Sequence, residues 1–261
     1  FGSDDFFISE KYNIPGIFVK DEKGNNVPIV DKSGKFVKEI KDFSGMSVKN
    51  FGNDEKLSTD IQIAIKLKKE NKAFLVEKYE HSYPHCWRTD KPILYYPLES
   101  WFIATTKFKN ELIQMNKEIN WQPESTGSGR FGNWLENIVD WNLSRSRYWG
   151  TPLPIWTTEN GDEEICIGSI KELKDEVKNS VKAGFMKNKL PDGFDLHRPY
   201  IDDIILVSKS GKKMKRQKDI IDVWFDSGAM PFAQHHYPFS NKKNFDKLFP
   251  ADFIAEGVDQ T

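Results

Sequence analysis

Three short segments carry side chains whose types and spacing could do chemistry. Asp4 and Asp5 are adjacent carboxylates, and Arg145 and Arg147 stand two residues apart in the tryptophan-rich stretch WNLSRSRYWG. A third segment, EGVDQ at 256–260, combines acidic and amide side chains with a glycine. A half-buried carboxylate is a natural partner for a substrate ammonium group, and guanidinium groups suit phosphates. These residue types could therefore bind an ammonium group and a phosphate group.

Each segment also has a purely structural interpretation. The Asp4–Asp5 pair could cap a helix that begins at FFISEKY, and Arg145 and Arg147 could form internal ion pairs. The basic run KSGKKMKRQK, residues 209–218, is typical of a solvated loop. A metal site at 81–86 (HSYPHC) is not expected, because i and i+4 lie far apart on an extended segment and a fourth ligand is missing.

The element that must position the two arginines is a predicted helix. Apolar residues recur at helical spacing between Phe131 and Val139, which predicts one buried face. Pro152 and Pro154 then favour an extended run.

The rest of the chain alternates between strand and helix patterns. Strands are predicted within 17–40 and 73–79, and helices over 53–72 and 105–120. For 157–220 a capping box at Ser169 and Glu172 predicts a helix in a small α+β region. DIIDVWFDSG, residues 219–228, predicts a buried strand entering a tight polar turn, and a last strand is expected at 250–255.

Composition excludes several classes of protein. The 261 residues include 38 basic and 39 acidic side chains, so the formal net charge of −1 gives no overall nucleic-acid signature. Two distant cysteines predict neither a disulfide framework nor a four-cysteine zinc site. No apolar run approaches the roughly 18–20 residues that a membrane span needs.

Longer motifs, in a fixed order, carry a family resemblance. WNLSRSRYWGTPLPIW resembles the W-x-(I/L)-S-R-x-R-x-W-G-x-P-(I/L)-P segment of class I aminoacyl-tRNA synthetases for branched aliphatic amino acids. Its neighbours are similar to segments of the isoleucyl-tRNA synthetase family and span nearly the whole chain: HSYPHCWRTDKP, SWFI, GRFGNWLEN, DVWFDSG and AEGVDQ. Several long motifs in register are more specific than one short pattern.

The resemblance implies two sets of site residues. In an editing pocket, Asp5 would bind the ammonium of a mischarged amino acid, with Phe1 and Tyr83 in the wall. Arg145 and Arg147 would lie near the acceptor end of tRNA. A second set would surround the aminoacyl-adenylate: Trp224, Glu256, Gly257, Asp259 and Gln260.

The resemblance also implies the fold class, which is α/β. It would combine incomplete Rossmann-type catalytic-core segments, a mixed α+β, β-barrel-like editing (CP1) portion and a small α+β insertion. The expected divisions are an editing portion at 1–97, a connecting helix and linker at 98–128, core segments at 129–157 and 219–261, and the insertion at 158–218.

The chain starts at Phe1 without Met and lacks an H-I-G-H nucleotide signature, so we expect an internal piece of a larger enzyme. KKMKR (212–216) lacks the serine of the family's K-M-S-K-S loop and precedes DVWFDSG, so it is not taken for that loop.

The function implied is that of a cytoplasmic, monomeric ligase. The parent would use ATP and Mg, charge tRNA(Ile) with isoleucine and hydrolyse Val-tRNA(Ile), while this piece alone is expected to be inactive and to bind no metal. Two alternatives stay open. One is a valyl- or leucyl-type synthetase, and the other is a module that binds a tRNA end without catalysis.

Overall fold

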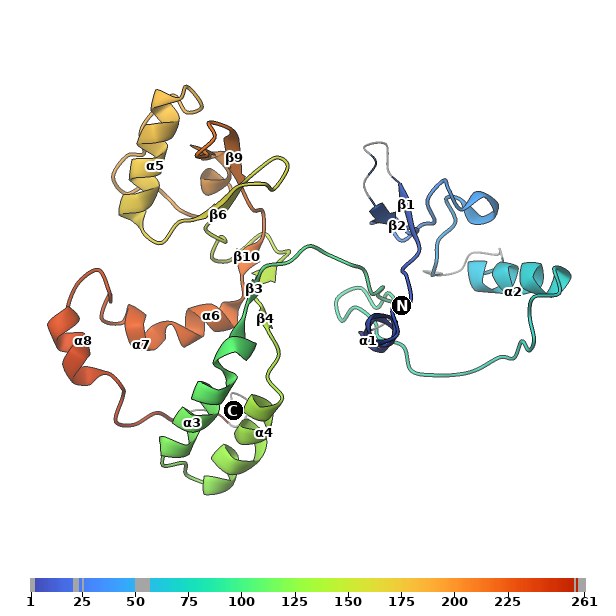
Figure 1. The fold of residues 1–261 in the computed structure, drawn as a ribbon, viewed down its shortest axis with the longest axis horizontal. Helices are drawn as coiled ribbons and strands as arrows, with labels where there is room; N and C mark the ends of the chain where they lie inside the picture. The colour runs from blue at the N-terminus through green and yellow to red at the C-terminus, as the bar shows by residue number, and fades with distance from the viewer. Residues whose placement is uncertain (1–2, 21–23, 25, 50–56, 256, 258–261) are drawn as a thin grey trace. The chain divides into compact units, whose positions relative to one another are not determined.

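The computed structural model describes residues 3–20, 24, 26–49, 57–255 and 257. The chain divides into two compact units, Phe1–Glu99 and Ser100–Thr261 (Figure 1). The predicted sites at Phe1, Glu256, Asp259 and Gln260 lie outside the described residues.

The first unit contains short elements joined by irregular chain. Strands β1 (Phe18–Lys20) and β2 (Asn26–Pro28) pair antiparallel, which confirms the hairpin predicted for this region. Helix α2 (Thr59–Lys69) is capped by the preceding residue, Ser58, whose hydroxyl accepts the Ile61 amide at 3.3 Å. The described residues of this unit also form α1 (Ser3–Lys11) and a 3-10 turn, η1 (Lys41–Phe43).

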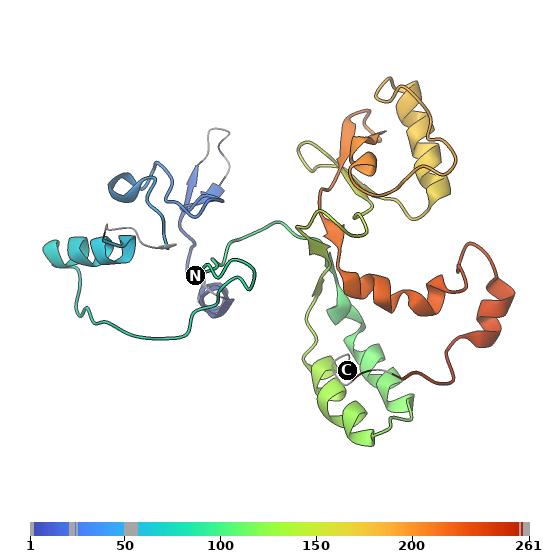
Figure 2. The same ribbon diagram turned by 180° about the vertical axis from the view of Figure 1, so that it is seen from behind.

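The second unit is built around a four-stranded antiparallel sheet with the strand order β7-β6-β9-β8. Helix α5 (Ile170–Lys182) contacts β8 and lies beside the sheet (Figure 2). The strands are β6 (Ile155–Thr158), β7 (Glu164–Cys166), β8 (Ile205–Val207) and β9 (Lys213–Arg216), and a 3-10 turn, η4 (Tyr200–Asp203), precedes β8.

The capping box and the apolar stripe predicted for α5 are confirmed. Ser169 Oγ accepts the Glu172 amide at 3.1 Å, and Glu172 Oε2 accepts the Gly168 amide at 2.7 Å. Leu173 and Val177 are buried. The helix therefore starts where its sequence satisfies the first free amides and continues because one face is apolar.

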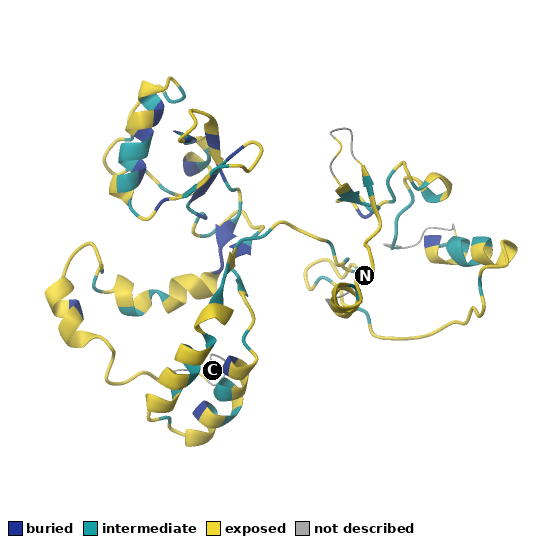
Figure 3. Cartoon of the chain, in the orientation of Figure 1, coloured by how far each residue is buried: buried dark blue, intermediate teal, exposed yellow. Residues whose placement is uncertain are grey.

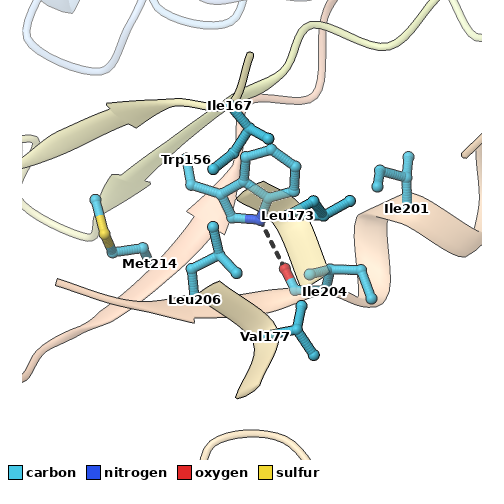
Figure 4. Packing of buried hydrophobic residues seen from close by; sticks show 8 residues of the cluster. All are labelled: Trp156, Ile167, Leu173, Val177, Ile201, Ile204, Leu206 and Met214. Carbon is cyan, nitrogen blue, oxygen red and sulfur yellow. Dashed lines mark hydrogen bonds between the residues drawn. The ribbon is translucent and has the colours of Figure 1, made fainter. Parts of the chain in front are cut away.

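The main hydrophobic core lies between α5 and the sheet (Figure 3). Trp156 is at its centre, and its indole N–H donates to the carbonyl of Ile204 at 2.8 Å (Figure 4). The buried partners come from β8, β9, α5 and the turns between them: Ile167, Leu173, Val177, Ile201, Ile204, Leu206 and Met214. A buried indole with its one donor satisfied fixes the register of these elements.

Two short antiparallel ladders lie beside this sheet. Strand β3 (Phe102–Ile103) pairs with β4 (Trp141–Asn142), and β5 (Ser144–Arg145) pairs with β10 (Ile220–Ile221). The helices of this part are η2 (Thr105–Phe108), α3 (Lys109–Glu118), a π-type turn η3 (Thr126–Arg130), α4 (Phe131–Glu136), α6 (Val223–Gly228), α7 (Met230–Ala233) and α8 (Lys242–Leu248).

The structure confirms a mixed α/β chain. Every strand pair that it describes is antiparallel, so the described residues contain none of the parallel pairs of a Rossmann sheet.

Several local predictions were wrong. Residues 73–79 and 250–255 form no strand, because no neighbouring segment pairs with them in the described chain. The turn expected after Ile221 is helix α6, capped by Asp222. The helix expected to include Ile138 and Val139 ends at Glu136. The basic run at 209–218 contains strand β9 rather than only a solvated loop.

Candidate functional site

The carboxylate of Asp222 joins three segments that the sequence had singled out. Asp222 is buried, and only 4% of the surface of the whole residue is exposed. Oδ1 accepts the Trp224 amide at 3.1 Å, which caps α6, and Oδ2 accepts the Trp141 indole N–H at 3.2 Å and the Arg145 guanidinium. A buried carboxylate with a neutral donor on one oxygen, and a charged and a neutral donor on the other, is held in one orientation.

Arg145 belongs to this arrangement and its neighbour Arg147 does not. Arg145 Nη2 donates to Asp222 Oδ2, and Arg145 Nη1 donates to the carbonyls of Asn142 at 2.8 Å and Ser144 at 2.9 Å. Arg147 is exposed, and its carbonyl accepts Arg198 Nη1 at 3.1 Å. Of the two predicted tRNA contacts, the structure thus gives Arg145 an internal ion pair and leaves the Arg147 side chain at the surface.

Asp140, which directly precedes the strand β4 that carries Trp141, ties this strand to the 3-10 turn η2. Its Oδ1 accepts the Thr106 hydroxyl at 2.6 Å and the Thr106 amide at 3.1 Å, and these bonds hold the pKa of Asp140 below its usual value.

The turn after Arg147 needs a glycine. Gly150 has φ +145°, and a Cβ there would lie 2.5 Å from Ile220 Cδ1.

Trp224 is the predicted adenylate-site residue that the structure describes best. It lies in the first turn of α6 and is 53% exposed, so the indole is neither buried in a core nor fully solvated. The other described member, Gly257, is exposed. The structure therefore brings Arg145 and Trp224 to one carboxylate, whereas the rest of the EGVDQ segment stays a prediction.

The predicted editing residues lie in the first unit. Asp5 is exposed in the first turn of α1, which begins at Ser3, so the interpretation of Asp4–Asp5 as a cap before FFISEKY is wrong. Tyr83 is half-buried, its hydroxyl donates to the Ile93 carbonyl at 2.7 Å, and the Lys49 ammonium lies 4.3 Å from its ring centre. Neither residue lines the 460 Å³ hollow found between η1 and α2.

A second ion cluster was missed by the sequence reasoning. Arg216 is 5% exposed, and its guanidinium binds Asp202 and donates to the carbonyls of Leu153 at 3.1 Å and Asp219 at 3.0 Å. The alternation Lys-Met-Lys-Arg over 213–216 is the signal that could have found it, because Met214 and Arg216 share the buried face of β9.

A hollow in the second unit has a volume of about 590 Å³ and is mainly apolar. Its wall combines the start of α5 with Leu153, Trp156 and Phe239. None of the predicted site residues lines it.

Within the described ranges, no group of three or more His, Cys, Asp or Glu side chains could hold a metal ion. No helix in the part of the chain that the structure describes is both long enough and apolar enough to cross a membrane.

Comparison with known proteins extends over the whole chain. The isoleucine–tRNA ligase of Cytophaga hutchinsonii is 62% identical and that of Bacteroides thetaiotaomicron 52%, each over 100% of this chain. The enzyme of Clostridium novyi is 47% identical over the same span. The chain covers only 25%, 26% and 22% of these three proteins. The family model "tRNA synthetases class I (I, L, M and V)" matches residues 20–261, and the chain belongs to that family.

Proposed function

We propose that this chain is part of an isoleucine–tRNA ligase whose full-length form activates isoleucine with ATP and transfers it to tRNA(Ile). One observation carries the proposal: the whole of this chain aligns, at 62% identity, with a protein of that name. The agreement extends to three bacterial relatives of the same name. The same proposal includes a cytoplasmic, monomeric parent.

The proposal assigns each part of the chain a place in the parent. Residues 129–157 and 219–261 are segments of a Rossmann-type catalytic core, and 158–218 is an insertion between them. Residues 1–97 are part of the editing (CP1) domain, and 98–128 connect it to the core. Two observations support this division: the chain separates at Glu99, and β5 of one core segment pairs with β10 of the other.

The amino acid and its adenylate are bound by Trp224 and the EGVDQ segment. The half-exposed indole of Trp224 supplies a flat apolar wall of the kind that suits an isoleucine side chain. Glu256, Asp259 and Gln260 offer acceptors for the ammonium group and the ribose hydroxyls, and Gly257 allows a close backbone approach. Arg147 is the better candidate for a tRNA phosphate, because Arg145 is already bound to Asp222.

Editing follows from the small difference between isoleucine and valine. One methylene group in an apolar pocket is worth about 1–3 kcal/mol, a range for which isoleucine–tRNA ligases are themselves a standard example. A second pocket therefore hydrolyses Val-tRNA(Ile). Within it Asp5 binds the substrate ammonium, and Phe1 and Tyr83 form part of the wall.

The proposal assigns the Mg²⁺ that accompanies ATP to no residue of this chain. No step is therefore assigned to a metal ligand of this chain.

The proposal is tested by amino-acid-dependent exchange of pyrophosphate into ATP, measured on the full-length protein with isoleucine, valine and leucine in turn. Isoleucine is expected to support exchange best, and preference for valine or leucine would identify a different member of the family.

A further inference from the structure

We propose that Asp222 is a positioning residue for amino-acid binding, which acts by holding the start of α6 and so fixing Trp224. This inference rests on the proposed function, because it requires Trp224 to be a wall of the isoleucine pocket. It adds a residue that contacts no substrate and nevertheless sets how tightly the amino acid binds.

The first step of the argument is the burial of Asp222. An ionised carboxylate away from water is costly unless its oxygens are satisfied. Asp222 is 4% exposed, and donors reach both of its oxygens. The chain has therefore collected an indole, a guanidinium and a backbone amide around one buried charge.

The second step is where those donors come from. Trp141 lies in β4, Arg145 lies in β5, and the amide belongs to Trp224 at the start of α6. The backbone of Asp222 adds a further tie, since its amide donates to the Leu143 carbonyl at 2.8 Å. Trp224 thus lies only two residues after Asp222, whose carboxylate is hydrogen-bonded to residues of β4 and β5.

The third step concerns Trp224 itself. Its indole is 53% exposed, so packing by the described residues alone leaves much of its surface uncovered. A six-residue helix such as α6 has few internal hydrogen bonds, and its first turn depends on its cap. Loss of the Asp222 cap would therefore give the Trp224 backbone more freedom, and a binding surface that is less preorganised binds more weakly.

The fourth step is the role of Arg145. Its guanidinium donates to Asp222 and to the carbonyls of Asn142 and Ser144, so it locks the carboxylate onto the β4–β5 segment. Arg145 and Asp222 act together, and Lys in place of Arg145 would lose the fork that makes these contacts simultaneously.

The test uses the full-length protein and the pyrophosphate-exchange assay. Asn has a single acceptor oxygen, so Asp222→Asn cannot both cap the Trp224 amide and accept from Arg145 and Trp141. It is expected to raise KM for isoleucine by about tenfold while KM for ATP and kcat change by no more than about twofold. Trp224→Ala should raise KM for isoleucine at least as much. The double variant should be no worse than Trp224→Ala alone, because the effect of Asp222 passes through Trp224.

Asp202→Asn is the matched control, because Asp202 is also a partly buried aspartate bound by arginine, but it lies in η4 and bonds to Arg216 and Arg198. It should lower the melting temperature and leave KM for isoleucine unchanged. If Asp222→Asn does not fold, Trp141→Phe removes one donor with little change in shape and should raise KM for isoleucine by a smaller factor.

The outcomes separate this inference from the proposed function. Wild-type exchange that prefers valine or leucine overturns the proposed substrate, and the KM ratio measured with that amino acid still tests Asp222. Equal losses in kcat, ATP KM and isoleucine KM, or additive effects of the two substitutions, would show that Asp222 only stabilises the fold and would overturn the inference. Absence of exchange with all three amino acids would overturn both.

Discussion

Arg216 extends from strand β9 into the interior and binds Asp202 in η4, so that a charged pair lies at the edge of the Trp156 core. The guanidinium of Arg216 donates through Nε to Asp202 Oδ1 at 2.8 Å, and a second nitrogen contacts the same oxygen. Asp202 Oδ2 accepts Arg198 Nε at 2.8 Å. The cluster therefore links β9, η4 and the segment before η4 through three side chains.

Removing Arg216 should destabilise the second unit strongly. Arg216→Ala leaves Asp202 with one cation and leaves the carbonyls of Leu153 and Asp219 without this donor. Breaking a buried pair from one side costs about 3–5 kcal/mol of unfolding free energy. Urea unfolding of the chain measures the loss. Lys215→Ala, at an exposed position of the same strand, is the matched control and should change stability by less than about 0.5 kcal/mol. Similar losses for the two variants would contradict the structural role of Arg216.

The same cluster predicts a dependence of stability on acid pH. Burial alone would raise the pKa of Asp202, but hydrogen bonds and charge from Arg216 and Arg198 outweigh it and hold the pKa below its ordinary value of 3.8. Since the folded pKa is lower than the unfolded pKa, this stabilisation is complete above the unfolded pKa and is lost as the pH falls through the folded pKa. Asp202→Asn should therefore be less stable than wild type at neutral pH, and the difference should shrink below pH of about 4. A difference that stays constant down to pH of about 2 would count against the pairing.

Trp156 should be the most costly core residue to truncate. Trp156→Ala removes the largest fully buried side chain and should cost about 3–5 kcal/mol, because the surrounding side chains cannot fill the cavity. Trp156→Phe keeps part of the volume but removes the donor to the Ile204 carbonyl, at a cost of about 1–3 kcal/mol. Denaturant titration gives both values. Trp149→Phe serves as control because Trp149 is 80% exposed, and it should be nearly neutral. An order of effects in which Trp149→Phe exceeds Trp156→Phe would be inconsistent with this core.

The editing proposal makes a prediction about Asp5 in the full-length protein. Asp5→Ala should leave isoleucine-dependent exchange intact and abolish deacylation of Val-tRNA(Ile), because the ammonium of the substrate loses its carboxylate partner. Asp4→Ala is the control, since it removes a neighbouring carboxylate from the same turn of α1. Deacylation by Asp5→Ala at the wild-type rate, or equal loss in the two variants, would refute the assignment to Asp5.

Local signals in the sequence predicted the second unit better than the first. The capping box and the stripe at Leu173 and Val177 located α5 correctly, because both are short-range patterns that the packed helix preserves. Strand predictions failed at 73–79 because a strand also needs a pairing partner, which a single segment cannot reveal. Within DVWFDSG, the aspartate before an apolar run was an N-cap signal that was read as a turn.

The sequence likewise predicted only part of the candidate site. Family motifs pointed to Arg145 and Trp224, and the structure joins both to Asp222. That junction could not be predicted, because the side chains of Trp141 and Asp222 meet across 81 positions of the sequence. Arg216 was also missed, since the burial of one basic side chain in a basic run depends on the sheet around it.

The central claim is that this chain forms part of the isoleucine-activating site of its parent. The most direct measurement is pyrophosphate exchange by the full-length protein, wild type against Asp259→Ala, with isoleucine, valine and leucine as separate substrates. We predict exchange that is supported best by isoleucine and lost in Asp259→Ala, because this carboxylate is proposed to bind the substrate. Normal isoleucine-dependent exchange by Asp259→Ala, or a wild-type preference for valine or leucine, would contradict the account.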